Sequence, residues 1–250
     1  MARVMTIIAA RGGSEGIPGK NLKNFCGKPL LAWAIESSKG AHLVSKTVVT
    51  TDSEEIASVA KKYGAEAPFL RPSHLATSEI AIEPSLIHAV QYYEKEIEFK
   101  ADYICLLQVT NPLRNSKMID VCIQEAINGN FDCVMTVNEI PANHTPFWSL
   151  VERNNKPAFF YEKDLNSRFG RRQDFPEICY ARNDLVYVFR PENLFMPKPN
   201  LYGDGANVKL VKTPSFYDGD INSKEDWILT ENLFKFLQSE EGKKIEFQNT

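Results

Sequence analysis

Residues 4–21 read VMTIIAARGGSEGIPGKN, and this stretch decides the fold. Its first part, residues 4–10, is a short apolar run of the kind that forms a buried strand. A loop with glycine at four positions follows at once, with Arg11 near its start and Lys20 near its end. Ligands collect at the carboxyl ends of strands in an open α/β sheet, and glycine lets backbone N–H groups turn toward an anion. The stretch therefore predicts an α/β fold with a phosphate-binding loop after its first strand.

Short apolar runs alternate with helical patterns along the rest of the chain. The predicted strands after the first are 46–51, 103–108 and 133–137, and the predicted helices are 30–38, 53–63, 118–127 and 224–238. This alternation is typical of βαβ units and predicts a doubly wound, mainly parallel sheet. Asp52 and Glu55 have the spacing of a capping box for the helix that follows residue 51.

The alternation lapses at residues 138–180, a polar and aromatic segment, and a predicted strand at 185–189 resumes it. We interpret 138–180 as an insertion into one domain formed by 1–137 and 181–250, and we expect the tail 240–250 to be exposed. Aromatic side chains are enriched at interfaces, so the insertion predicts a homodimer, unless its rings pack on their own domain. The rings in question are Phe147, Trp148, Phe159, Phe160 and Tyr161.

Composition narrows the classes of partner and the compartment. The net charge of −3 argues against nucleic acid, whose phosphate backbone requires a surplus of Lys and Arg on one face. Residues 4–10 are too short to cross a membrane, so we expect no membrane partner and a cytoplasmic protein. The five cysteines are scattered and form no CxxC pair, which favours buried thiols over disulfides or a zinc site.

The glycine-rich loop almost fits three familiar motifs. A Walker A loop requires glycine where Ser14 stands and Ser or Thr where Asn21 stands, and no GxGxxG dinucleotide fingerprint is present. Residues 12–16 match the GxSxG of serine hydrolases, yet residues 17–19 prolong the loop where a helix should begin. A serine hydrolase is thus a weak alternative, and a Gly-Pro turn with solvated cations is the structural one.

Nine ordered blocks of the sequence resemble one family, the cytidylyltransferases that make CMP-sialic acid and its relatives CMP-pseudaminate and CMP-legionaminate. The blocks are 10–14, 19–21, 27–30, 50–53, 69–72, 106–108, 112–114, 171–174 and 220–227. The resemblance implies a fold like that of the nucleotide-diphospho-sugar transferases. It also implies that CTP and an acidic nine-carbon sugar are joined with release of pyrophosphate, that Mg²⁺ assists, and that the inserted segment dimerises.

The resemblance implies a role for each residue that matches a family motif. The residues implied for nucleotide binding are Ala10, Arg11, Gly12, Gly13, Ser14, Lys20, Asn21 and Arg71. Those implied for the sugar acid are Gln108, Arg114, Arg172, Gln173, Asn183 and Asp184, with Arg172 reaching the neighbouring subunit. Mg²⁺ is expected at Asp220 with Asn222, and the implied catalytic residues are Arg11, Lys20 and Asp220.

Several of these residues have a structural alternative. Arg71 could be a surface cation, and Gln108 or Arg114 could cap the helix that follows. Asn222 is spaced as an N-cap of the last helix, and Ser223 offers a competing cap one residue later.

The sequence also departs from the family pattern. Glu15 stands where relatives commonly have lysine, Asp184 where they have glycine, and Asn222 where they have the second aspartate of a metal pair. Residues 78–83 lack the small hydroxyl side chains that contact the nucleotide in the family, so we assign no contact there. Two alternatives stay open: a catalytically silent nucleotide- or sugar-binding protein, and a cytidylyltransferase for a different 2-keto-3-deoxy sugar acid. No short motif selects among the nonulosonic acids.

Overall fold

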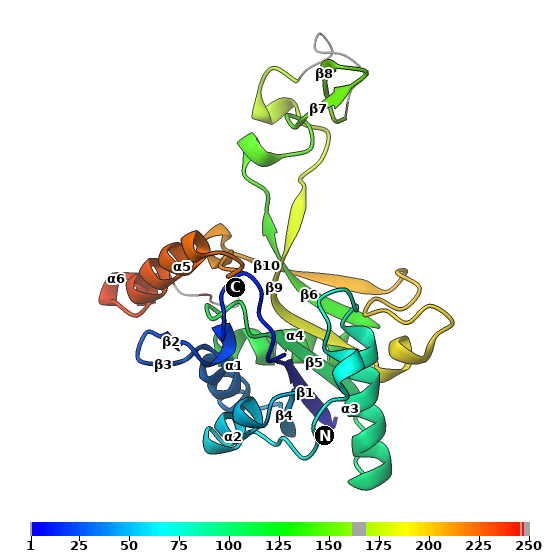
Figure 1. Cartoon of the computed structure of the whole chain (residues 1–250). Coiled ribbons are helices and arrows are strands. Elements are labelled where there is room, and N and C mark those ends of the chain that lie inside the picture. Colours follow the sequence, from blue (N-terminus) through cyan, green and yellow to red (C-terminus); the bar gives the residue numbers. More distant parts are fainter. Residues whose placement is uncertain (1, 162–168, 246, 248–250) are drawn as a thin grey trace.

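A computed structural model describes residues 2–161, 169–245 and 247 of the chain. Its six-stranded sheet has the order β10-β6-β9-β5-β1-β4 (Figure 1). The strands are β1 (Val4–Ala9), β4 (Lys46–Thr50), β5 (Tyr103–Gln108), β6 (Cys133–Glu139), β9 (Tyr180–Phe189) and β10 (Val208–Thr213). Only β9 runs antiparallel to its neighbours in this sheet, so the predicted mainly parallel sheet is confirmed.

Helices cover both faces of the sheet, as a doubly wound fold requires. The α-helices are α1 (Leu30–Lys39), α2 (Glu54–Lys62), α3 (Glu83–Glu96), α4 (Ser116–Asn128), α5 (Lys224–Leu237) and α6 (Glu240–Lys244). Side chains alternate along β1: Val4 and Ile8 join the core beneath α1, α2, α4 and α5, whereas Met5 and Ile7 join the core beneath α3. Each face of β1 is therefore buried by a different set of helices.

The remaining elements are short. They are the two-residue strands β2 (Asn24–Phe25) and β3 (Lys28–Pro29), the hairpin β7 (Leu150–Arg153) and β8 (Lys156–Phe159), and the 3-10 turns η1 (Lys20–Leu22), η2 (Ser73–Leu75), η3 (Ala142–His144), η4 (Arg172–Asp174), η5 (Pro191–Phe195) and η6 (Ser215–Tyr217).

The capping box predicted for α2 is wrong. Ser53 has extended backbone angles and is the N-cap, because its hydroxyl accepts from the Ile56 amide at 3.3 Å. The Asp52 carboxylate instead accepts from the Gly12 amide. Asp52 is thus free of any role in starting the helix.

The chain after residue 239 is not simply an exposed tail. Residues 240–244 form α6, which the Ser239 hydroxyl caps by accepting from Gly242 at 3.1 Å. Phe247 is buried, and its amide donates to the Tyr217 hydroxyl at 2.9 Å. The expected exposure holds for Glu240, Glu241, Lys243, Lys244 and Ile245 but is wrong for Gly242 and Phe247, which are buried.

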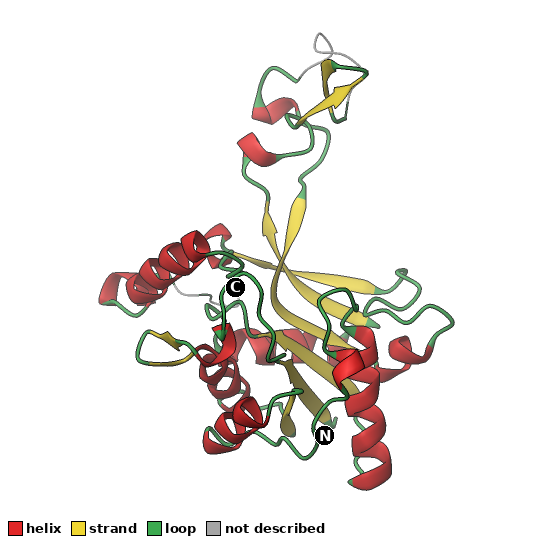
Figure 2. Cartoon of the chain, viewed as in Figure 1, coloured by secondary structure: helices red, strands yellow, loops and turns green. Residues whose placement is uncertain are grey.

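Residues 140–161 and 169–179 form an arm that extends beyond the sheet, with β6 leading into it and β9 leading out (Figures 1 and 2). Phe147 is 2% exposed and stacks on Tyr161, Phe169 and Phe175 with ring centres 4.9–5.4 Å apart. Part of the predicted aromatic load therefore forms a small core within the arm. Other apolar side chains of the arm are more than half exposed, and these are Leu150, Phe160, Tyr161 and Ile178.

Cys105, Cys122 and Cys133 are buried free thiols in β5, α4 and β6, as their apolar surroundings in the sequence predict. Burial raises the pKa of Cys105 and of Cys133 to about 12. These thiols stay protonated at neutral pH and contribute to packing.

Candidate functional site

A cavity of about 470 Å³ opens at the carboxyl edge of the sheet, where β1 and β5 end. Six residues of the glycine-rich loop line it, and Gln108 lines it from the end of β5. The structure thus brings together side chains from distant parts of the chain, which are Arg11, Ser14, Lys20, Asn21, Arg71, Gln108 and Asn222. This is the edge at which ligands bind in open α/β sheets.

The glycine-rich loop packs against the loop that precedes α5. A Cβ atom on Gly16 would lie 2.2 Å from the Asn222 carbonyl oxygen, so only glycine fits at this contact. The Lys20 ammonium donates to the Ile221 carbonyl at 2.7 Å, and the Asn21 side-chain amide donates to the Arg11 carbonyl at 2.8 Å. These contacts hold Lys20 and Asn222 on the same wall of the cavity.

Lys20 is partly withdrawn from water at this position. Burial lowers its pKa, the nearby Asp220 carboxylate opposes that shift, and Arg11 adds to it. Arg11 and Lys20 therefore both face the cavity, and the Asp220 carboxylate lies close enough to Lys20 to influence its pKa. A bound anion would restore part of the stabilisation that burial removes from the ammonium group.

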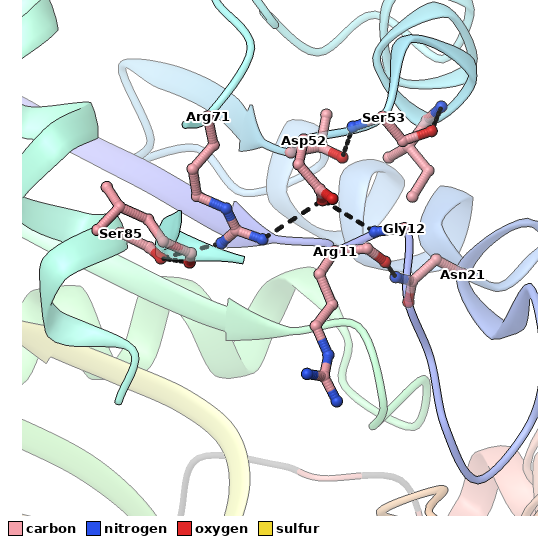
Figure 3. A network of polar contacts seen from close by, with 10 residues as sticks. Arg11, Gly12, Asn21, Asp52, Ser53, Arg71 and Ser85 are labelled. Carbon is pink, nitrogen blue, oxygen red and sulfur yellow. Dashed lines mark hydrogen bonds and ion pairs between the residues drawn. The ribbon is translucent and has the colours of Figure 1, made fainter. Parts of the chain in front are cut away.

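Arg71 is held behind the cavity by a network that joins three segments (Figure 3). Its backbone amide donates to the Thr51 carbonyl at 2.7 Å, and its guanidinium donates to the Ser85 hydroxyl at 3.0 Å. An Asp52 oxygen lies 3.8 Å from the guanidinium. Arg71 is only 6% exposed, so the alternative of a surface cation is wrong. The Arg11 side chain points away from this network in Figure 3.

Asp220 and Asn222 lie side by side in the loop before α5. The Asn222 side-chain amide donates to an Asp220 oxygen at 2.6 Å. Ser223 and Asp226 form the capping box of α5, so the alternative that Asn222 caps this helix is wrong. Within residues 2–161, 169–245 and 247, no cluster of three or more His, Cys, Asp or Glu side chains could hold a metal ion.

Arg114, one of the residues predicted for the sugar acid, joins the end of β5 to β9. Arg114 is 4% exposed and donates to the Leu185 carbonyl at 2.7 Å and to the Gln108 carbonyl. Burial lowers its pKa to about 10, opposed by Cys105, Asp184 and Asp220. This geometry fixes the two strands relative to each other, and Arg114 is not among the residues that line the first cavity.

Asn183 and Asp184 form a kink in β9. Asn183 is buried, and its side chain bonds Thr136, Asn138 and Thr213 at 2.6–2.7 Å. Asp184 has a φ of 53°, in the left-handed region that favours glycine, and its carboxylate accepts from the Tyr187 hydroxyl. The buried network supports this uncommon backbone conformation.

Arg172 and Gln173 lie elsewhere, lining a second cavity of about 460 Å³ in the arm. Arg172 donates to the Glu139 carboxylate at 2.6 Å. Neither residue lines the first cavity, so a single chain does not bring them to Lys20 and Gln108.

Two features of the site escaped the sequence interpretation. Residues 75–78 and 80–82 line the first cavity, although no contact was assigned to residues 78–83. Asp52 contacts the glycine-rich loop, and its place just after β4, where a ligand-binding residue is expected, was a usable signal. In the part of the chain that the structure covers, no helix is long and apolar enough to cross a membrane.

Comparisons with known proteins point to one family. The family model described as cytidylyltransferase matches residues 5–202. The chain is 31% identical to CMP-N,N'-diacetyllegionaminic acid synthase of Campylobacter jejuni over 234 residues, covering 93% of this chain and 95% of the relative. It is 33% identical to pseudaminic acid cytidylyltransferase of Campylobacter jejuni over 231 residues, covering 92% and 96% of the two chains.

Solved structures support the fold. The structure of CMP:2-keto-3-deoxy-manno-octonic acid synthetase complexed with CTP matches with a TM-score of 0.70, covering 94% of this chain and 99% of that one. The identity is 15%, so this likeness bears on architecture alone. The 4-diphosphocytidyl-2C-methyl-D-erythritol synthase of Anaerococcus prevotii matches with a TM-score of 0.63 at 12% identity.

Proposed function

We propose that this chain, which belongs to the cytidylyltransferase family, joins CMP from CTP to the anomeric hydroxyl of a nonulosonic acid and releases pyrophosphate. The observation that carries the proposal is the convergence of Arg11 and Lys20 with a glycine-rich loop on one cavity, opposite Gln108. Relatives named for legionaminic and pseudaminic acids, covered over nearly their whole length, support the substrate class.

The reaction requires positioning and neutralisation of charge. The sugar hydroxyl attacks the α-phosphate of CTP while negative charge builds on the departing pyrophosphate, so fixed cations stabilise the transition state more than the ground state. Lys20 suits this role because its bond to the Ile221 carbonyl fixes it in place. Gln108, at the end of β5, has a neutral side chain that accommodates the carboxylate of the sugar acid.

The residues before α5 fit a magnesium ion. Mg²⁺ prefers hard oxygen ligands and binds through one or two carboxylates together with substrate phosphates. Asp220 supplies such a carboxylate, and the neutral Asn222 beside it supplies an amide oxygen. When bound, Mg²⁺ would neutralise charge on the triphosphate. The donor set favours a site that fills together with CTP.

The arm supports a homodimer. Leu150, Phe160 and Ile178 are 56–60% exposed on an arm that extends beyond the sheet. A second copy of the chain would bury this apolar surface, which carries the aromatic side chains common at interfaces. The second cavity in the arm, with Arg172 and Gln173, would then be available to the partner's site.

A pyrophosphate-release assay tests the activity. CTP is expected to support turnover well above ATP, GTP or UTP with at least one acid from a panel of sialic, legionaminic, pseudaminic and 2-keto-3-deoxy-octonic acids. Equal turnover with all four nucleotides would contradict the cytidylyl specificity. Binding of CTP without turnover on any acid would identify a silent binding protein instead.

Light scattering at working concentration tests the dimer. The chain is expected at twice its monomer mass of 28.3 kDa, and Phe160→Asp together with Leu150→Asp should shift it to the monomer. A monomer mass for the unmodified chain would refute the dimer.

A further inference from the structure

The Asp52 carboxylate joins two parts of the nucleotide site that lie far apart in sequence. Strands β1 and β4 are parallel neighbours with Ala9 opposite Thr50, so their loops leave the sheet side by side. The Ala10 amide still donates to the Thr50 carbonyl at 3.1 Å. Asp52 follows two residues after β4 and therefore reaches the start of the glycine-rich loop.

One oxygen of this carboxylate serves both neighbours. The Gly12 amide donates to Asp52 Oδ1 at 2.9 Å, and an Arg71 guanidinium nitrogen lies 3.8 Å from the same oxygen (Figure 3). A Cβ atom on Gly12 would meet Ser53 Cβ at 3.4 Å, so the loop already lies close against this segment. The loop backbone and the guanidinium are thus both tied to one atom.

Arg71 is a buried cation with this carboxylate beside it. Burial lowers its pKa, and the Asp52 carboxylate is the group that opposes the shift. The Arg71 side chain is 5% exposed, and its buried Nε has no hydrogen-bond partner among the residues described. A buried cation without a nearby anion would be costly, so Asp52 stabilises the guanidinium in its buried position.

The network continues from Arg71 through Ser85 to Leu75, which lines the cavity. The Ser85 hydroxyl, which accepts from Arg71, donates to the Leu75 carbonyl at 3.1 Å. Leu75 begins a second segment that lines the cavity, residues 75–78 and 80–82. Movement of Asp52 would therefore disturb both the glycine-rich loop and the segment that begins at Leu75.

A structural role in α2 does not account for Asp52, because Ser53 is the N-cap of that helix. We infer that Asp52 is a positioning residue for the nucleotide, holding the Gly12 amide and the Arg71 guanidinium at a fixed separation for the phosphates of CTP. The inference rests on the proposed cytidylyltransferase function.

Variants at this position give the test. Asp52→Ala removes both contacts and should raise the Kd and the KM for CTP about tenfold, the usual loss for one hydrogen bond to a charged group. Asp52→Asn keeps the shape of the side chain and the oxygen that accepts from Gly12. We therefore expect about a third of the change in log Kd and log KM for CTP that Asp52→Ala causes. The KM for the sugar acid should stay within about twofold in both, since no sugar contact changes. Glu55→Gln, an exposed carboxylate of α2, is the matched charge control and should behave as the unmodified chain.

A double-mutant cycle with Arg71→Ala separates positioning from general damage. If Asp52 acts through Arg71, Asp52→Ala should weaken CTP binding by about threefold rather than tenfold once Arg71 is gone, because only the Gly12 contact is then left to lose. Losses that multiply in the double variant, or equal losses for CTP and the sugar acid, would overturn the inference. Thermal unfolding monitors folding, and Asp52→Asn carries the test if Asp52→Ala fails to fold.

Calorimetric titration with CTP keeps this test independent of turnover. A chain that binds CTP but turns over no acid contradicts the proposed reaction while still testing Asp52 through the Kd. Unchanged CTP affinity in Asp52→Ala, in an otherwise active enzyme, overturns the role of Asp52 alone. Absence of CTP binding in the unmodified chain overturns both.

Discussion

Gly16→Ala is expected to damage the site by displacing one loop from another. The added Cβ atom would lie 2.2 Å from the Asn222 carbonyl oxygen, short of the 3.4 Å of ordinary contact by more than 1 Å. The obstacle is a backbone atom, so a side-chain rotation cannot relieve it. The loop before α5 and the glycine-rich loop must therefore separate by about 1 Å.

The magnitude follows from this displacement. Overpacking of this kind costs about 1–3 kcal/mol of stability, which lowers the melting temperature by about 2–10 °C in a chain of this size. Asp220 and Lys20 lie on the two loops that separate, and a misplacement of about 1 Å can cost about 100-fold in rate. We expect kcat/KM for CTP to fall by about that factor.

Two measurements check this prediction. Pyrophosphate release gives kcat/KM, and calorimetric or fluorescence melting gives the stability. Gly13→Ala is the matched stability control, because a Cβ atom there would meet nothing within 4 Å, and its melting temperature should be unchanged. Wild-type melting and wild-type kcat/KM in Gly16→Ala would refute the steric reasoning.

Three further predictions address individual side chains. Lys20→Met should lower kcat about 100-fold or more by removing a fixed cation from the developing charge, whereas Lys23→Met, an exposed lysine outside the cavity, should not; equal rates in both variants would remove Lys20 from the mechanism. Asp220→Ala should abolish most activity at any Mg²⁺ concentration, and Asn222→Asp should lower the Mg²⁺ needed for half-maximal rate, so an unshifted titration would argue against Asn222 as a ligand. Arg114→Met should cost about 2–4 kcal/mol in urea unfolding by leaving two buried carbonyls unpaired, and unchanged stability would contradict its bracing role.

The parallel core of the fold could be predicted because its signals are local. The strand at 103–108 was placed with its observed bounds, and the helix at 30–38 differs by one residue from Leu30–Lys39. In contrast, α3 was missed because it is a weakly amphipathic helix that begins without a side-chain cap. The pattern also gave no sign that β9 inserts antiparallel between β5 and β6, since strand order depends on contacts distant in sequence.

The candidate site divides in the same way. Arg11, Lys20 and Asn21 belong to one loop, and their convergence on a cavity was predictable from that loop alone. The role of Asp52 could not be predicted in this way. Asp52 and Ser53 are both good N-caps for α2, and only the backbone angles decide between them. Likewise, Arg114 is held by a hydrogen bond to the Leu185 carbonyl of β9, a strand that follows the arm in sequence, so its position could not be predicted from nearby residues.

The route of the chain through the arm also bears on how the sheet assembles during folding. Strand β9 lies between β5 and β6, yet residues 140–179 separate it from β6 along the chain. Closing a flexible loop of that length costs about 2–3 kcal/mol more entropy than closing a two-residue turn. The rings around Phe147 contact one another within the arm, and contacts of this kind, once formed, shorten the effective loop. Completion of the central sheet is thus kinetically linked to a cluster of aromatic side chains outside it, so Phe147→Ala should slow the docking of β9 while leaving the packing of β1 against β4 and β5 unaltered.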